Sequence, residues 1–161
     1  MPGLNLTRDE AIERAGIIKR VHTYRVDLDL RTDKDVFSSI VEIRFDAELG
    51  ASTFIDAITS QVNSIELNGE RLDPALADGE RIALPNLAAQ NVLKIDAEMF
   101  YTNTGEGLHR FVDPADGEIY LYSQFEVPDS RRVFPVFEQP DLKAEFEFSV
   151  RVPSHWVVVS N

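Results

Sequence analysis

The stretch from residue 118 to residue 127 carries side chains that could bind a protonated amine. If this stretch is a strand, its period of two places four side chains on one face: Tyr120, Tyr122, Gln124 and Glu126. The carboxylate of Glu126 and the amide of Gln124 would then lie about 6 to 7 Å apart along the strand, next to aromatic walls. An ion pair at about 4 Å contributes roughly 4 kcal/mol at an effective dielectric of 20, before desolvation. The same pattern is also typical of a strand face that contacts only water.

Residues 131 to 140 combine arginines, prolines and aromatic residues, and this combination favours a structural role over a catalytic one. The two prolines fix φ and remove backbone donors, which indicates an irregular crossing between strands. Phe134 and Phe137 are expected to anchor the crossing in the core. An arginine could cap carbonyl groups there or pair with Glu138.

Other residues that could do chemistry lack the spacing that their chemistry needs. No two histidines show the helical H-x-x-x-H spacing, so no zinc site is expected within the chain: His22, His109 and His155. The chain has no cysteine, which excludes thiolate catalysis and disulfides. No candidate serine nucleophile lies in a G-x-S-x-G elbow: Ser38, Ser39 and Ser123.

The composition indicates one globular domain of 161 residues. Its 28 acidic and 16 basic residues give a net charge of −12, which repels phosphate backbones and argues against a nucleic-acid partner. The negative field favours cationic ligands, although an acidic surface that only confers solubility explains the charge equally well. No segment approaches the ~20 apolar residues of a membrane span, and the first residues do not read as a secretory signal. We therefore expect a cytoplasmic protein without membrane contact.

A helix is predicted from Arg8 to Lys19. Thr7 and Glu10 have the spacing of a capping box, in which each side chain satisfies a backbone amide of the other residue. Three apolar side chains share one helix face and are expected to dock the helix on the body: Ala11, Ala15 and Ile18.

Alternation of polar and apolar residues predicts strands over 21–30 and 41–47, joined by a short link at 31–35. Further strands are expected at 52–57, 61–67, 81–84, 92–100, 118–127, 142–150 and 157–160, with a turn at Asn68-Gly69. One face of the strand at 118–127 should point inward: Ile119, Leu121, Phe125 and Val127. The predicted fold is all-β, a mostly antiparallel β-sandwich with one short N-terminal helix. We divide it into a helix with its lead-in (1–20) and a β-sandwich domain (21–161).

Four motifs near the C-terminal end occur in the order and spacing of a known family. They are Ser123-Gln124-Phe125-Glu126, the run RRVFPVFEQP at 131–140, Lys143-Ala144-Glu145-Phe146, and the run WVVVSN at 156–161. In these motifs the chain resembles the N-terminal domain of the aminopeptidase N family of zinc metallo-aminopeptidases, the gluzincin aminopeptidases. The family pattern has Cys, Asp and Glu where this chain has Val136, Glu138 and Gln139. A salt bridge made by the usual Asp-Glu pair would be altered here.

The resemblance implies a saddle-like fold and assigns roles to two residues. Gln124 and Glu126 would line the first substrate pocket and hold the N-terminus of a peptide. Glu126 would share the ammonium group with the glutamate of a downstream Gly-Ala-Met-Glu-Asn motif. Neither that motif nor H-E-x-x-H occurs in the chain. We therefore expect a domain cut off before the catalytic domain, with no catalytic or metal-binding residue of its own.

The resemblance also sets expectations for the full-length protein. That protein would use zinc to remove single residues from peptide N-termini, whereas the isolated fragment would bind no zinc and be inactive. Its partners would be peptides with a free N-terminus and its own catalytic domain. Two alternatives remain, a non-catalytic interaction module built on a β-sandwich and a family member that acts as an epoxide hydrolase. Glu126 favours the aminopeptidase over the epoxide hydrolase, because an ammonium group needs a charged acceptor.

Overall fold

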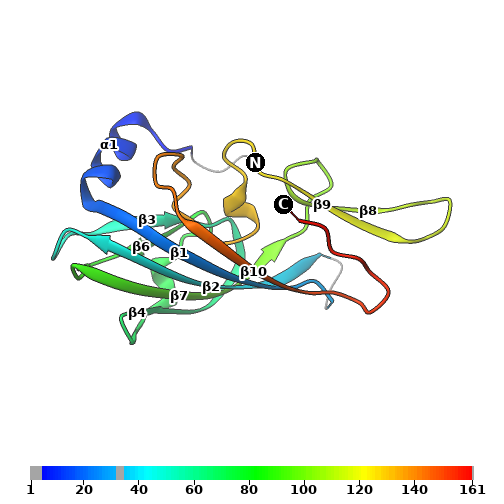
Figure 1. Cartoon of the computed structure of the whole chain (residues 1–161), viewed down its shortest axis with the longest axis horizontal. Coiled ribbons are helices and arrows are strands. Elements are labelled where there is room, and N and C mark those ends of the chain that lie inside the picture. The colour runs from blue at the N-terminus through cyan, green and yellow to red at the C-terminus, as the bar shows by residue number, and fades with distance from the viewer. Residues whose placement is uncertain (1–4, 32–34, 161) are drawn as a thin grey trace.

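The computed structural model describes residues 5–31 and 35–160 and is built mainly of strands (Figure 1). The largest sheet has six strands in the order β10 (Glu145–Arg151), β1 (Ile18–Asp29), β2 (Val36–Ala47), β7 (Gln90–Phe100), β4 (Thr59–Leu67) and β5 (Glu70–Leu72). Two smaller sheets pair β3 (Thr53–Asp56) with β6 (Arg81–Leu84) and β8 (Gly107–Val112) with β9 (Ile119–Gln124). All pairs are antiparallel except β1 with β10, so the predicted all-β, mostly antiparallel fold is confirmed.

One apolar core joins the layers of the fold. Side chains of the central strands, including Val26, Val41 and Ile95, are buried together with Ile55 and Ile82 of the small β3–β6 sheet. Val26 lies opposite Val41, and Val41 lies opposite Ile95, so the alternating apolar residues of three strands meet on one face. The period of two in the sequence therefore predicts both the strands and their inward face.

The predicted turn at Asn68-Gly69 joins β4 to the short strand β5, which the sequence did not predict. Asn68 has φ 56° and Gly69 has φ 83°, and a two-residue hairpin of type I′ requires positive φ at both positions. The strand β5 is followed by η1 (Pro74–Leu76), a 3-10 turn capped by the carboxylate of Asp73. The predicted link between β1 and β2 falls largely on residues 32–34, which lie outside the described residues.

Helix α1 (Arg8–Ile17) has the predicted capping box but does not dock through the predicted apolar face. Ala15 is exposed, Ile18 already belongs to β1, and the helix ends two residues before Lys19. The buried side chain of the helix is instead Arg14, which is 1% exposed. The docking prediction was therefore wrong for Ala15 and for the helix face, because Ile18 is buried as a residue of β1 and the buried side chain of the helix itself is polar.

Two predicted strands near the C-terminal end differ from the structure. The strand predicted at 118–127 ends at Gln124, and the residues from 126 to 129 form a turn. The strand predicted at 157–160 does not form, and Val157 and Val159 are 88% and 89% exposed. The strand β10 forms one edge of the main sheet, and residues 157–160 form no ladder with any described strand. A run of β-branched apolar residues alone does not make a strand when no neighbour supplies backbone partners.

The ion pair between α1 and β6 should make the stability of the fold depend on pH. The hydrogen bond from Arg81 to Glu10 (2.6 Å) and the Thr7 backbone bond lower the pKa of Glu10 from 4.5 to about 2. A carboxyl group whose pKa is lowered by folding stabilises the fold above its unfolded pKa, and this stabilisation is lost as the pH falls through the folded value. We expect Glu10→Gln to lose less free energy of unfolding than the wild type between pH 4.5 and about pH 2, as measured by urea unfolding. Identical pH profiles for the two chains would contradict this.

Candidate functional site

The structure places the two predicted site residues together, but not on one strand. Gln124 is the last residue of β9 and lies opposite Gly107 of β8. Glu126 lies in the turn that follows, and its backbone N–H donates to the side-chain Oε1 of Gln124 at 2.9 Å. Because the Glu126 backbone N–H is used in this bond, it cannot pair with a neighbouring strand, and β9 ends before it. The distance of about 6 to 7 Å expected along a strand therefore does not apply to these two side chains.

The carboxylate of Glu126 is available to a ligand as far as the described residues show. Both Gln124 and Glu126 are exposed. Within residues 5–31 and 35–160, Glu126 makes no ion pair, and its backbone N–H, not its carboxylate, is bonded to the side chain of Gln124. An exposed carboxylate next to an amide can accept hydrogen bonds from a cation such as a protonated amine.

The turn at residues 126–129 is held by side chains of the 3-10 turn that follows it, η2 (Ser130–Arg132). The Nε of Arg131 donates to the carbonyl oxygen of Pro128 at 3.0 Å, and Arg131 is 2% exposed. The Nε of Arg132 pairs with the Asp129 carboxylate at 2.7 Å. The predicted capping of carbonyl groups by an arginine is thus confirmed. These two contacts hold Pro128 and Asp129, two and three residues after Glu126.

Glycine is required where the β8–β9 hairpin meets η2. Gly107 has φ +64°, and a Cβ atom at this position would lie 2.7 Å from the Cβ of Arg132. Any larger residue would push the hairpin away from η2. Since Gly107 pairs with Gln124, this close approach sets the place of the candidate site relative to the body of the domain.

A groove of about 620 Å³ lies beside the hairpin and is separate from the candidate site. It is lined by β9, by the end of β10 and by the C-terminal segment, which runs beside β8 and β9 in Figure 1. Ser123 and Phe125 line the groove, whereas Gln124 and Glu126 do not. Tyr120 and Tyr122, predicted as walls around the amine, line this groove. Tyr120, Tyr122 and Gln124 alternate within β9 and so share one face of the strand, whereas Glu126 lies beyond its end, so the prediction of one face with all four side chains was wrong for Glu126.

The predicted inner face of this strand is confirmed only in part. Leu121 and Phe125 pack against the core as partly buried residues. Val127 was expected to point inward but is 63% exposed. The chain has left the strand before it reaches Val127, so the period of two no longer applies.

The segment from residue 131 to residue 140 is structural, as predicted. Phe134 and Phe137 are both buried in the core. Glu138 accepts hydrogen bonds at its Oε2 from the Ser130 hydroxyl at 2.5 Å and from the Arg131 backbone N–H at 2.8 Å. The segment therefore connects η2 to the body of the domain.

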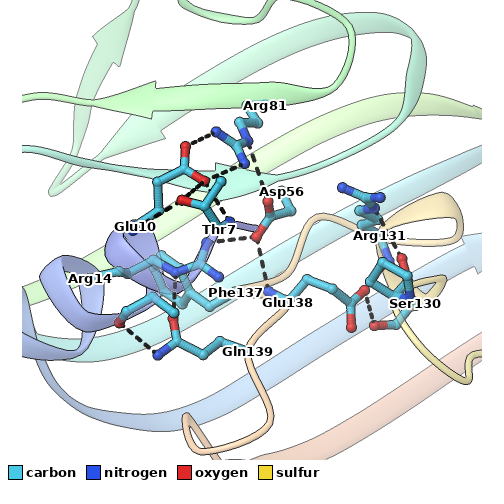
Figure 2. Close-up of polar contacts among 12 residues, drawn as sticks. Thr7, Glu10, Arg14, Asp56, Arg81, Ser130, Arg131, Phe137, Glu138 and Gln139 are labelled. Carbon is cyan, nitrogen blue, oxygen red and sulfur yellow. Dashed lines mark hydrogen bonds and ion pairs between the residues drawn. The ribbon is translucent and has the colours of Figure 1, made fainter. Parts of the chain in front are cut away.

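A buried polar network, which the sequence did not reveal, lies between α1 and this segment (Figure 2). The Nη1 of Arg14 pairs with Asp56 at 2.6 Å, and its Nε donates to the Oε1 of Gln139 at 2.9 Å. Gln139 also donates from its Nε2 to the Ala11 carbonyl oxygen at 3.0 Å. An ionised carboxylate cannot donate, so a glutamate at position 139 could not make this contact with Ala11. No local signal marks these partners, because they lie 42 and 125 residues from Arg14 in the sequence.

The histidines are separate from one another, and each has a local partner. His22 lies 3.0 Å from Asp46, His155 lies 3.8 Å from Glu118, and His109 accepts from the Gly105 backbone and stacks on Tyr122. Among the residues that the structure describes, no three His, Cys, Asp or Glu side chains form a group that could hold a metal ion. In the same part of the chain, no helix is long and apolar enough to cross a membrane.

Comparisons with known proteins point to one family. The model of the peptidase M1 N-terminal domain matches residues 21–161. The chain is 52% identical to aminopeptidase N of Streptomyces lividans over all of its length, but it spans only 19% of that protein. It is 30% identical to probable aminopeptidase 1 of Saccharolobus solfataricus over 66% of its length, which is 13% of that protein.

Solved structures share the fold at low sequence identity. Yeast LTA4 hydrolase in complex with bestatin superposes with a TM-score of 0.68 at 19% identity, covering 93% of this chain and 25% of that one. Legionella pneumophila aminopeptidase A in complex with aspartic acid gives 0.66 at 14% identity, covering 81% and 16%.

Proposed function

Because this chain belongs to the peptidase M1 N-terminal domain family, we propose that the full-length protein is a zinc aminopeptidase and that this domain binds the N-terminus of the peptide. The observation that carries the proposal is the pair formed by Gln124 and Glu126, which the structure presents together at the exposed end of β9. The 52% identity to an aminopeptidase N supports the same reaction class.

Glu126 is the acceptor for the substrate's ammonium group. The terminal amine of a peptide is positively charged, whereas the nitrogen of an interior peptide bond is neutral. A carboxylate at this place therefore favours peptides whose first residue is free over internal segments of a chain. The side chain of Gln124 accepts the 2.9 Å hydrogen bond from the Glu126 backbone N–H. It therefore fixes the position of the backbone from which the Glu126 side chain extends.

The metal belongs to another part of the protein. The described residues offer no group of side chains that fits zinc, so no catalytic step is assigned to this chain. Under this proposal the domain positions the substrate, and the catalytic domain of the same protein supplies the hydrolysis. The division into a lead-in at 1–20 and a β-sandwich at 21–161 stays a prediction.

Metal removal tests the proposed reaction. We expect the full-length protein to hydrolyse aminoacyl p-nitroanilides, to lose this activity on dialysis against a chelator and to regain it with zinc, because a bound metal ion polarises the carbonyl and activates water. The same substrate with an acetylated amine is the control and should not be hydrolysed. The 161-residue chain alone should show neither activity nor zinc in elemental analysis.

The other results of this assay identify the alternatives. A full-length protein that hydrolyses neither substrate and holds no zinc would be a non-catalytic interaction module. A protein that opens an epoxide but leaves aminoacyl substrates intact would be an epoxide hydrolase. Equal hydrolysis of the free and the acetylated substrate would contradict recognition of the terminal amine.

A further inference from the structure

Helix α1 lies outside the residues that the family model matches, yet its Arg14 is among the most buried side chains of the domain. Arg14 reaches from the helix to Asp56 at the end of β3 and to Gln139 (Figure 2). Its guanidinium also lies over the rings of Phe54 and Phe137, 4.8 and 5.9 Å from their centres. A helix that only covers the surface would not need a buried charge. The contacts of Arg14 therefore indicate that this side chain has a further role.

Asp56 connects Arg14 to the segment of residues 136–138. The same Oδ2 that pairs with Arg14 accepts the backbone N–H of Glu138 at 3.1 Å. The backbone of Asp56 also exchanges two hydrogen bonds with Val136, each 3.0 Å long. The positions of Val136 and Glu138 are therefore fixed relative to Asp56 and, through it, relative to α1.

Glu138 completes the connection to the turn that carries Glu126. Its side chain accepts from Ser130 and from the Arg131 backbone, and both residues belong to η2 (Figure 2). Arg131 donates in turn to the Pro128 carbonyl, two residues after Glu126. The lead-in also contacts η2 directly, because the Oδ1 of Asn5 accepts from the Nη2 of Arg131 at 3.3 Å.

We propose that Arg14 is a positioning residue for Glu126, acting through Asp56, Glu138 and η2. This inference rests on the proposed function, because it matters to catalysis only if Glu126 binds the substrate amine. It gives the N-terminal helix a role in substrate recognition, although the helix lies far along the chain from the site.

The test is steady-state kinetics of the full-length enzyme with Arg14→Met. Loss of the link should displace the Glu126 turn and raise KM for an aminoacyl substrate about threefold to tenfold, with a smaller change in kcat per folded enzyme. A purely structural role would reduce the folded fraction, which lowers the maximal rate and leaves KM unchanged. If Arg14→Met does not yield folded enzyme, Arg14→Lys decides the question. Lysine keeps the charge next to Asp56, but its single nitrogen cannot replace both bonds of the guanidinium.

Two further variants make the outcome specific. Ile65→Ala is the matched control for instability, because Ile65 is fully buried in β4 and contacts neither α1 nor η2 through the polar network. It should leave KM unchanged. In a Glu126→Gln background, Arg14→Met should raise KM no further, since both changes act on one contact. An unchanged KM in the folded Arg14 variant, with a raised KM in Glu126→Gln alone, would overturn the positioning role. An unchanged KM in Glu126→Gln would instead overturn the proposed function.

Discussion

In the full-length protein, Glu126→Gln is expected to lower kcat/KM for aminoacyl substrates about 10-fold to 100-fold, because a hydrogen bond to a charged group contributes roughly 1.5 to 3 kcal/mol. Glutamine keeps the size of the side chain and removes the charge that the ammonium group needs. The turn itself should stay in place, since Gln124 contacts the Glu126 backbone and not its carboxylate. The loss should therefore appear in the kinetics and leave thermal unfolding unchanged.

The control for this prediction is another exposed carboxylate on the same hairpin. Glu118 lies just before β9, at the end opposite to Gln124, and its carboxylate lies 3.8 Å from the Nε2 of His155. Glu118→Gln changes the net charge by the same amount and should leave kcat/KM within about twofold, because surface charges act weakly at this range. Equal kinetics for Glu126→Gln and Glu118→Gln would contradict the role of Glu126.

The second large effect is expected from Asp56→Ala, which should destabilise the domain by about 3 to 5 kcal/mol. Arg14 and Asp56 are both 1% exposed, so loss of the carboxylate leaves a buried guanidinium without its counter-ion. Arg81 lies 3.7 Å from the same carboxylate and would lose a partner too. The free energy of unfolding of natural domains is only about 5 to 15 kcal/mol, so this one substitution should remove a large part of it. Urea unfolding of the chain measures the difference.

A more exposed carboxylate provides the matched comparison for Asp56. Asp46 lies 3.0 Å from the Nε2 of His22, but both side chains are about one-third exposed, and even a charged pair at the surface contributes about 1 kcal/mol or less. Asp46→Ala should therefore have a small effect. The double variant Arg14→Met with Asp56→Asn removes both buried charges and should recover part of the lost stability. If Asp56→Ala lowers the free energy of unfolding no more than Asp46→Ala does, the buried Arg14–Asp56 pair does not have the stabilising role described here.

Local patterns explain which parts of the fold could be predicted from the sequence. The alternating residues of β1, β2 and β7, the capping box at Thr7 and the turn at Asn68-Gly69 each depend on neighbours within a few residues. The strand predicted at 157–160 shows the limit of such patterns. Its apolar residues alternate with nothing polar, and the structure gives them no pairing strand.

The choice of Gln124 and Glu126 as site residues stays a prediction, and the sequence did not predict how the two residues are arranged. Gln124 and Glu126 are adjacent because a side chain accepts from a backbone amide at the end of β9, which no strand period describes. The role of Arg14 was invisible for another reason. Its partners Asp56 and Gln139 are brought to it by the tertiary fold, and a single arginine in a polar helix resembles an ordinary surface residue.

A crystal structure of the full-length protein with a bound, non-hydrolysable dipeptide analogue tests the central claim most directly. We expect the terminal nitrogen of the ligand to lie about 3 Å from a carboxylate oxygen of Glu126, as charge-assisted hydrogen bonds require. The amide of Gln124 should line the same pocket. A ligand whose amine is held entirely by other residues, with Glu126 in solvent, would contradict the claim that this domain recognises the peptide N-terminus.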